Sequence, residues 1–118
     1  MYAHPKMKRC NYTFTPRSRE GAKNPPLKDK LCYGVDLRGA DCEEVIAEGF
    51  NLEYIIDAYH KTNLGDKFFT PFFEKLVGVE YIRTMIIEGK TASEIRNRWQ
   101  ADVTRFKALR KKYLLYQE

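Results

Sequence analysis

The spacing of apolar residues changes along this chain, and this change constrains the possible folds more than any other feature. Residues 8–15 and 30–37 each alternate polar and apolar side chains, at the period of two that a half-buried β-strand requires. From residue 51 onward the apolar residues recur every three or four positions, which is typical of amphipathic helices. The sequence therefore predicts an α+β domain in which a small sheet of at least two strands packs against helices.

Each predicted strand presents one apolar face. The first strand, residues 8–15, turns three side chains to the same side, namely Cys10, Tyr12 and Phe14. The second strand, residues 30–37, is expected to turn four apolar side chains inward, namely Leu31, Tyr33, Val35 and Leu37. Cys32 and Asp36 then lie on its opposite face. Most of the helix and strand breakers fall between the strands, so residues 17–29 predict an exposed loop.

Start and stop signals divide the rest of the chain into helices. Helical signals mark one short segment and three longer ones, at about 41–47, 51–61, 79–88 and 92–114. Asp41 and Asn51 are suitable N-cap residues, and Gly89 is a suitable end for the third helix. Thr91 and Glu94 have the spacing of a capping box, which predicts that the last helix starts there.

The last predicted helix carries an apolar stripe and many basic residues. Its apolar positions step by three or four residues, at Ile95, Trp99, Val103, Phe106, Leu109 and Tyr113. A basic helix–turn–helix would allow nucleic-acid binding, with phosphate contacts from Arg96, Arg98, Arg105 and Lys107. However, Trp99 and Phe106 predict that the helix packs inward along its length. The basic residues would then be scattered and not focused on one surface, so no nucleic-acid partner is expected. A protein-interaction module is the other alternative.

Length and composition limit the possible classes of protein. The 118 residues fit a single domain, 1–118, and 43% of them are hydrophobic, which is enough for a packed core. No apolar run approaches the roughly 20 residues of a membrane span. The first nine residues lack the apolar stretch of a signal peptide, so the chain is either cytoplasmic or preceded by an export signal upstream.

The reactive residue types form no recognisable catalytic or metal-binding set. Three cysteines, Cys10, Cys32 and Cys42, lack CxxC spacing and any metal-ligand spacing with the two histidines, so neither a metal nor another cofactor is expected. Free, mostly buried thiols are favoured, with a Cys10–Cys32 disulfide left open. Among the acidic residues, Asp36 stands out beside Arg38 at a strand end. An ion pair between them or a turn cap is favoured over a substrate contact, and no catalytic residue is assigned.

Several short segments, taken in order, resemble the C-terminal domain of the exo-β-N-acetylmuramidase family. They are Phe14-Thr-Pro16, Cys32-Tyr-Gly-Val-Asp-Leu-Arg38, Asn51-Leu-Glu-Tyr-Ile-Ile-Asp-Ala-Tyr59, Phe72-Phe-Glu-Lys-Leu-Val-Gly78, Glu88-Gly-Lys90 with Ile82, Ile95 and Trp99, and Tyr113-Leu-Leu-Tyr116. The resemblance implies a periplasmic or secreted glycoside hydrolase that removes non-reducing-end N-acetylmuramic acid from peptidoglycan fragments. In that family an N-terminal Rossmann-like domain carries the catalytic carboxylate, so this chain alone is expected to be inactive.

The resemblance also implies two partners and a candidate site. The partners are the N-terminal catalytic domain of the parent protein and a peptidoglycan-derived muropeptide or sugar, held in a cleft where the two domains meet. The candidate substrate-binding residues are Tyr33, Asp36, Arg38, Phe69 and Phe72. Sugars stack on aromatic rings and hydrogen-bond to paired polar groups, which is the chemistry these side chains offer. The alternative for the phenylalanines is burial in the local core or against the N-terminal domain.

Overall fold

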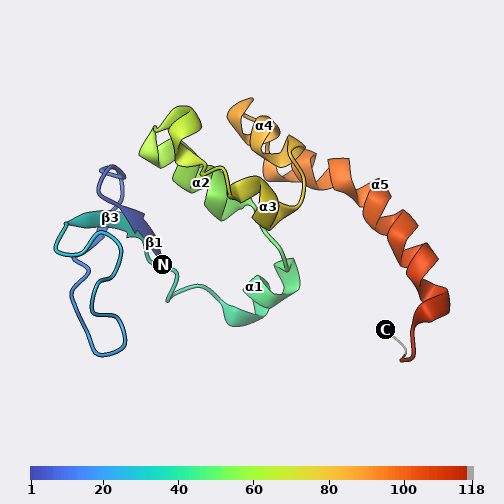
Figure 1. Cartoon of the computed structure of the whole chain (residues 1–118), viewed down its shortest axis with the longest axis horizontal. Coiled ribbons are helices and arrows are strands. Elements are labelled where there is room, and N and C mark those ends of the chain that lie inside the picture. The colour runs from blue at the N-terminus through green and yellow to red at the C-terminus, as the bar shows by residue number, and fades with distance from the viewer. Residues whose placement is uncertain (117–118) are drawn as a thin grey trace. The chain divides into compact units, whose positions relative to one another are not determined.

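The computed structural model describes residues 1–116 and has an α+β fold, as predicted (Figure 1). Its three strands are β1 (Tyr2–His4), β2 (Tyr12–Phe14) and β3 (Cys32–Val35). Its α-helices are α1 (Cys42–Glu48), α2 (Glu53–Thr62), α3 (Phe73–Val77), α4 (Tyr81–Ile87) and α5 (Ala92–Arg110). Two short 3₁₀ helices, η1 (Gly65–Phe68) and η2 (Lys111–Tyr113), complete the order.

The residue contacts group the chain into two compact units. The first unit is Met1–Phe72 and contains the sheet, α1, α2 and η1. The second unit is Phe73–Glu118 and contains α3, α4, α5 and η2. The prediction of one domain over 1–118 stays a prediction, and its last two residues lie outside the described range.

The sheet is antiparallel, with strand order β1-β3-β2. The prediction of at least two strands is therefore confirmed, although the first is much shorter than residues 8–15. The first part of that segment forms turns instead, because Met7 and Cys10 donate backbone hydrogen bonds to His4 and Met7, at 3.1 and 3.2 Å. Strand β1 could not be recognised from the sequence, because three residues are too few to show an alternating pattern.

The predicted inner face of the second strand is wrong. In β3, Cys32 is fully buried and Gly34 is buried as well, whereas Leu31, expected inside, is exposed. A glycine adds no apolar character to a sequence pattern, so the buried face could not be recognised from alternation. Here the missing side chain has a role in packing. A Cβ atom on Gly34 would lie 2.2 Å from the Tyr2 carbonyl oxygen of β1.

A tyrosine and an aspartate connect the sheet to α2 within the first unit. The Tyr2 ring of β1 meets the Tyr54 ring of α2 edge-on, with centroids 6.3 Å apart. The Tyr2 hydroxyl donates a hydrogen bond to the Asp57 carboxylate, which also accepts one from the Lys61 ammonium at 2.8 Å. The buried side chains of this unit include Met7, Cys32 and Leu52.

The helices of the first unit begin close to the predicted positions. Asp41 caps α1, since its carboxylate accepts a hydrogen bond from the Glu43 amide at 2.8 Å. Asn51 accepts a similar bond from the Glu53 amide at 2.8 Å, and α2 starts at Glu53 rather than at Asn51. The helix ends at Thr62, and the backbone of the next residue, Asn63, is left-handed (φ 49°). Shifts of one or two residues are usual at helix ends, which fray.

The capping box of the last helix is confirmed. Thr91 Oγ1 accepts a hydrogen bond from the Glu94 amide at 3.2 Å, and the Glu94 carboxylate accepts one from the Thr91 amide at 2.8 Å. Ile95, in the first turn of α5, is fully buried. The Arg98 guanidinium also lies over the Tyr81 ring of α4, 5.0 Å from its centroid.

The prediction that the last helix packs inward along its length is wrong. Beyond Trp99 its apolar residues are exposed, by 58% for Phe106, 56% for Leu109 and 71% for Tyr113. Length explains this difference. The 19 residues of α5 span about 28 Å, whereas the seven of α4 span about 10 Å, so a helix as short as α4 cannot cover the whole stripe.

Candidate functional site

Two of the candidate residues, Asp36 and Arg38, form an ion pair directly after β3. The Arg38 guanidinium donates to both oxygens of the Asp36 carboxylate, with distances of 2.8–3.0 Å. The Arg38 backbone amide donates a further bond to Asp36 Oδ1 at 3.0 Å, so the carboxylate closes a tight turn. The structure thus contains both the ion pair and the turn cap that the sequence favoured.

Tyr12 of β2 is a third member of this group and was not among the residues predicted for the site. The Arg38 guanidinium carbon lies 5.6 Å from the centroid of the Tyr12 ring, within range of a cation–π interaction. Strand pairing brings the two together, because Tyr12 is the register partner of Gly34 and β3 leads directly into the Asp36 turn. The available signal was the tyrosine in a predicted strand, but pairing between strands cannot be deduced from alternation.

The ion pair fixes the charge state of both residues. Hydrogen bonds from Arg38 hold the pKa of the Asp36 carboxyl at about 2, below its usual 3.8. Hydrogen bonding to Asp36 in turn raises the pKa of the Arg38 guanidinium. Asp36 is therefore ionised at neutral pH. A carboxylate in this state cannot supply the proton that the leaving group of a glycoside requires.

The orientation of Arg38 leaves most of its side chain accessible. That side chain is 72% exposed even though Asp36 and Tyr12 hold it. A guanidinium fixed on one edge by a carboxylate can still donate hydrogen bonds from its other edge. The group formed by Tyr12, Asp36 and Arg38 is thus suited to binding a carboxylate or a set of sugar hydroxyls. We call these three residues the strand-end site.

Tyr33 lies within β3, next to the strand-end site in sequence. It is half-buried, and its register partners are His4 in β1 and Thr13 in β2. Alternation places it on the opposite face from the buried Cys32 and Gly34.

The two phenylalanines of the candidate site differ in exposure. Phe69 is only 9% exposed and belongs to an aromatic cluster, where its ring lies 5.7 Å from Tyr59 and 5.0 Å from Phe68 between centroids. This arrangement matches the alternative of burial in the local core. Phe72 is 58% exposed. Of the two phenylalanines, Phe72 is therefore the one whose ring solvent can reach.

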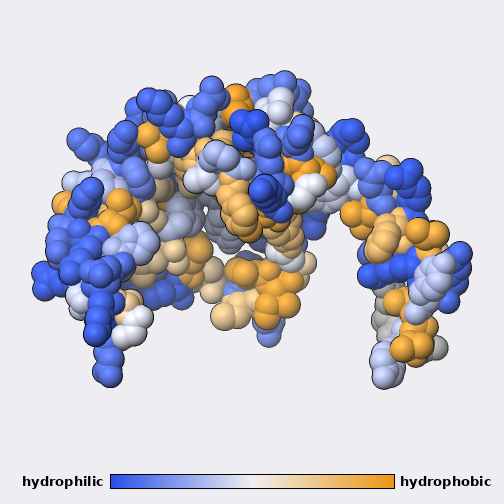
Figure 2. All heavy atoms as spheres, viewed as in Figure 1, coloured by the Kyte–Doolittle hydropathy of each residue, from blue (hydrophilic) through white to orange (hydrophobic). Residues whose placement is uncertain are grey.

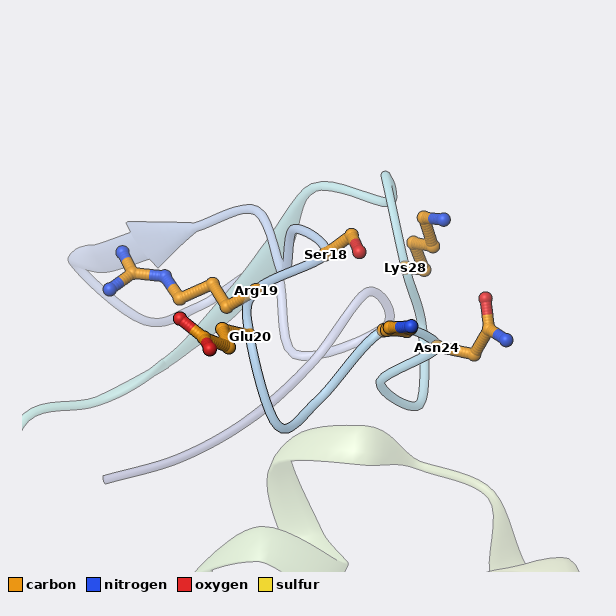
Figure 3. A pocket seen from close by; sticks show the side chains of 6 residues that line it. Ser18, Arg19, Glu20, Asn24 and Lys28 are labelled. Carbon is orange, nitrogen blue, oxygen red and sulfur yellow. The ribbon is translucent and has the colours of Figure 1, made fainter.

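The loop over residues 17–29 encloses an open hollow of about 620 Å³ in the first unit (Figure 3). Its lining residues are Ser18, Arg19, Glu20, Lys23, Asn24 and Lys28. All six are exposed, as the loop prediction required, and none carries an aromatic ring. The sticks in Figure 3 point in several directions rather than toward one centre. The hollow therefore lacks the stacking surface of a sugar site.

Within residues 1–116 no group of three or more His, Cys, Asp and Glu side chains is placed to hold a metal ion. The cysteines of this range are free, but only Cys32 is buried, whereas Cys42 is exposed, so the expectation of mostly buried thiols is wrong. None of the helices in these residues has the length and apolar character needed to span a membrane.

The chain is similar to known proteins in both sequence and structure. The family model for "Exo-beta-N-acetylmuramidase NamZ, C-terminal" matches residues 2–116. The peptidoglycan beta-N-acetylmuramidase NamZ of Bacillus subtilis (strain 168) is 35% identical over 88 residues, which are 73% of this chain and 21% of that protein.

A crystal structure of a DUF1343 family protein from Bacteroides fragilis is also similar, with 59% sequence identity and a TM-score of 0.92. The match covers 99% of this chain and 33% of the Bacteroides chain. This chain therefore spans about one fifth and one third of the lengths of these two relatives. From the match over residues 2–116, the chain belongs to the family of C-terminal domains of the exo-β-N-acetylmuramidase NamZ.

Proposed function

We propose that this chain is the accessory domain of a peptidoglycan-fragment exo-β-N-acetylmuramidase and forms one wall of the substrate cleft. Family membership supports the accessory role, and the Bacillus relative is named for that activity. The chemistry is assigned to a partner domain, the N-terminal catalytic domain of the parent protein. The parent protein is proposed to act in the periplasm or outside the cell, where peptidoglycan lies.

The exposed guanidinium of Arg38 is the single observation that carries the cleft role. N-acetylmuramic acid bears a lactyl group that ends in a carboxylate or, in a muropeptide, in the stem peptide with its own carboxylates. A guanidinium donates paired hydrogen bonds to such a group. Asp36 and Tyr12 hold Arg38 in place before the substrate arrives, which reduces the entropy lost on binding.

Two further side chains are assigned to the same wall. Phe72 is exposed and offers a ring face to the sugar, while Tyr33 is half-buried on the strand that leads to Asp36. Phe69 is assigned the supporting role of packing against Tyr59 and Phe68. The ionised Asp36 is not suited to donate a proton to a leaving group, so we assign this wall to substrate binding and the cleavage chemistry to the partner domain.

Substituting Arg38→Ala in the parent protein tests the cleft role. We expect KM for a soluble muropeptide to rise by about tenfold or more, because the variant loses the charge-assisted hydrogen bonds that Arg38 would donate to the substrate. We expect kcat to change little, since Arg38 is assigned to binding alone. Steady-state kinetics of N-acetylmuramic acid release give both values.

Three controls make this test specific. Arg38→Lys keeps the charge but loses the paired geometry, so an intermediate KM is expected. Arg105→Ala removes another exposed arginine, one paired with Asp102 on α5, and is expected to leave KM unchanged. This chain alone is expected to release no sugar. An unchanged KM in Arg38→Ala would remove the strand-end site from the cleft, and sugar release by the chain alone would refute the accessory role.

A further inference from the structure

The last helix carries a row of exposed apolar side chains that its own unit does not cover. The row consists of Val103, Phe106, Leu109 and Tyr113, each at least 37% exposed, and we call it the α5 stripe. Figure 2 shows hydrophobic atoms at the surface along this helix. The residues step by three or four positions, so they share one face of the helix. A row of large apolar side chains of this kind marks a contact surface.

The helix that carries the stripe is well defined. The capping box at Thr91 stabilises its start, and an ion pair between Arg105 and Asp102 at 3.1 Å lies on its surface. After Arg110 the backbone continues directly as the 3₁₀ helix η2, which contains Tyr113. The stripe is therefore a regular helical face and not part of an irregular tail.

We infer that the α5 stripe docks against the part of the parent protein that this chain does not span. This inference rests on the proposed function, because it requires a parent with a further domain. The Bacteroides relative has the same fold over 99% of this chain, and that match accounts for only 33% of its own length. A protein of this family thus contains about twice as much further polypeptide, which is enough to cover one face of a helix.

Charge argues against a second copy of this chain as the occupant. Residues 91–116 contain seven Arg and Lys residues and two acidic residues, Glu94 and Asp102. Two copies packed stripe to stripe would bring these like charges together. The complementary surface is instead apolar in its centre, with acidic residues around the edge. An anionic membrane would also match this charge, and the experiment includes it as an outcome.

Phe106→Asp in the full-length parent protein tests the inference, with Ala108→Asp as the matched control. Ala108 lies about 200° around the helix from Phe106, on the opposite face, and is exposed. Phe106→Asp is expected to lower the midpoint of thermal unfolding by about 4 °C or more, because a carboxylate would be buried at the docked face. Leu109→Asp is expected to act in the same way. Ala108→Asp is expected to leave the midpoint within about 1 °C.

Additional measurements separate the possible occupants. In this chain by itself Phe106 is exposed, so Phe106→Asp should leave its far-UV circular dichroism and its own unfolding midpoint unchanged. A midpoint in the parent that responds equally to Phe106→Asp and Ala108→Asp overturns the inference. Light scattering on this chain gives a second test: a concentration-dependent dimer that Phe106→Asp abolishes would also overturn the inference. Binding of the wild-type chain, but not Phe106→Asp, to phosphatidylglycerol vesicles overturns it as well.

Activity distinguishes this inference from the proposed function. Suppose that the wild-type parent releases no N-acetylmuramic acid, while the stripe variants alone have a lower unfolding midpoint. This result would refute the proposed reaction and retain the docking surface. A parent that is active, and whose unfolding does not respond to the stripe variants, retains the reaction and refutes the docking surface.

Discussion

At the scale of single residues, Gly34 shows how a missing side chain determines packing. Its Cα lies where β1 approaches β3, and an added Cβ would lie 2.2 Å from the Tyr2 carbonyl oxygen and 2.4 Å from the Ala3 Cβ. A strand cannot yield locally without disturbing its hydrogen-bond ladder. We expect Gly34→Ala to lower the free energy of unfolding by about 3 kcal/mol, toward the upper end of overpacking costs. Urea denaturation followed by circular dichroism measures this change.

Gly39→Ala is the matched control for that experiment. A Cβ on Gly39 meets no atom within 4 Å, and its backbone is not in the left-handed region. Its free energy of unfolding is expected to stay within about 0.5 kcal/mol of the wild type. If both variants were equally stable, β1 would not pack on β3 as described.

The Asp57 carboxylate predicts a dependence of stability on pH. Burial raises its pKa, but hydrogen bonds from Lys61 and Tyr2 more than offset this, so the folded-state pKa lies below 3.8. The stabilisation is then complete above the pKa of the unfolded chain and is lost as pH falls through the lower folded-state pKa. We therefore expect Asp57→Asn to be less stable than the wild type at pH 7 and 5, and the difference to shrink near pH 3.

Urea denaturation of both proteins at pH 7, 5 and 3 measures this difference. Tyr2→Phe removes one of the two donors to Asp57, so it is expected to show the same trend with a smaller amplitude. A difference that is as large at pH 3 as at pH 7 would show that the Asp57 charge contributes nothing to it.

At the scale of elements, the capping box of α5 is a local signal that the structure retains. The bonds between Thr91 and Glu94 satisfy amides that the first helical turn leaves unpaired. Thr91→Ala is expected to lower the free energy of unfolding by about 1 kcal/mol. Thr104→Ala, an exposed position within the same helix, is expected to change it by less than about 0.5 kcal/mol. Equal losses in the two variants would mean that the cap is not formed.

Elements with strong local signals were predicted well, and those without were not. Asp41, Asn51 and Thr91 all act on backbone amides two or three residues ahead, so their helices start within two residues of the predicted positions. The strand β1 has no such signal, because it is three residues long and is stabilised by pairing with β3. The strand predicted over 8–15 forms only at Tyr12–Phe14, where β3 is alongside.

The candidate site shows the same division. The contact between Asp36 and Arg38 spans two residues and could be predicted from their neighbourhood in the sequence. Tyr12 joins them only because β2 pairs with β3, which brings together positions more than 20 residues apart. The burial of Phe69 depends on Tyr59 and Phe68, whereas Phe72, three residues later, is exposed.

At the scale of the whole molecule, the α5 stripe relates this chain to the longer proteins of its family. A helical apolar stripe was predicted to lie inside, and the structure leaves most of it exposed. The exposure of Val103, Phe106, Leu109 and Tyr113 is explained if the surface that covers them lies in the further two thirds of polypeptide that the Bacteroides relative contains. The docking test given above for Phe106→Asp therefore concerns the parent protein and not this chain alone.

The sequence by itself determined the features that depend on neighbouring residues: the α+β class, three of the helix starts, the Asp36–Arg38 pair and membership of the family. Only the tertiary structure decided which face of β3 is buried, that Tyr12 supports Arg38, and which apolar residues remain exposed. The physical reason is that periodicity and capping act within one or two turns of the chain. Burial depends on which distant segment packs against a residue. The alternation of polar and apolar residues is the same whether that segment is present or not.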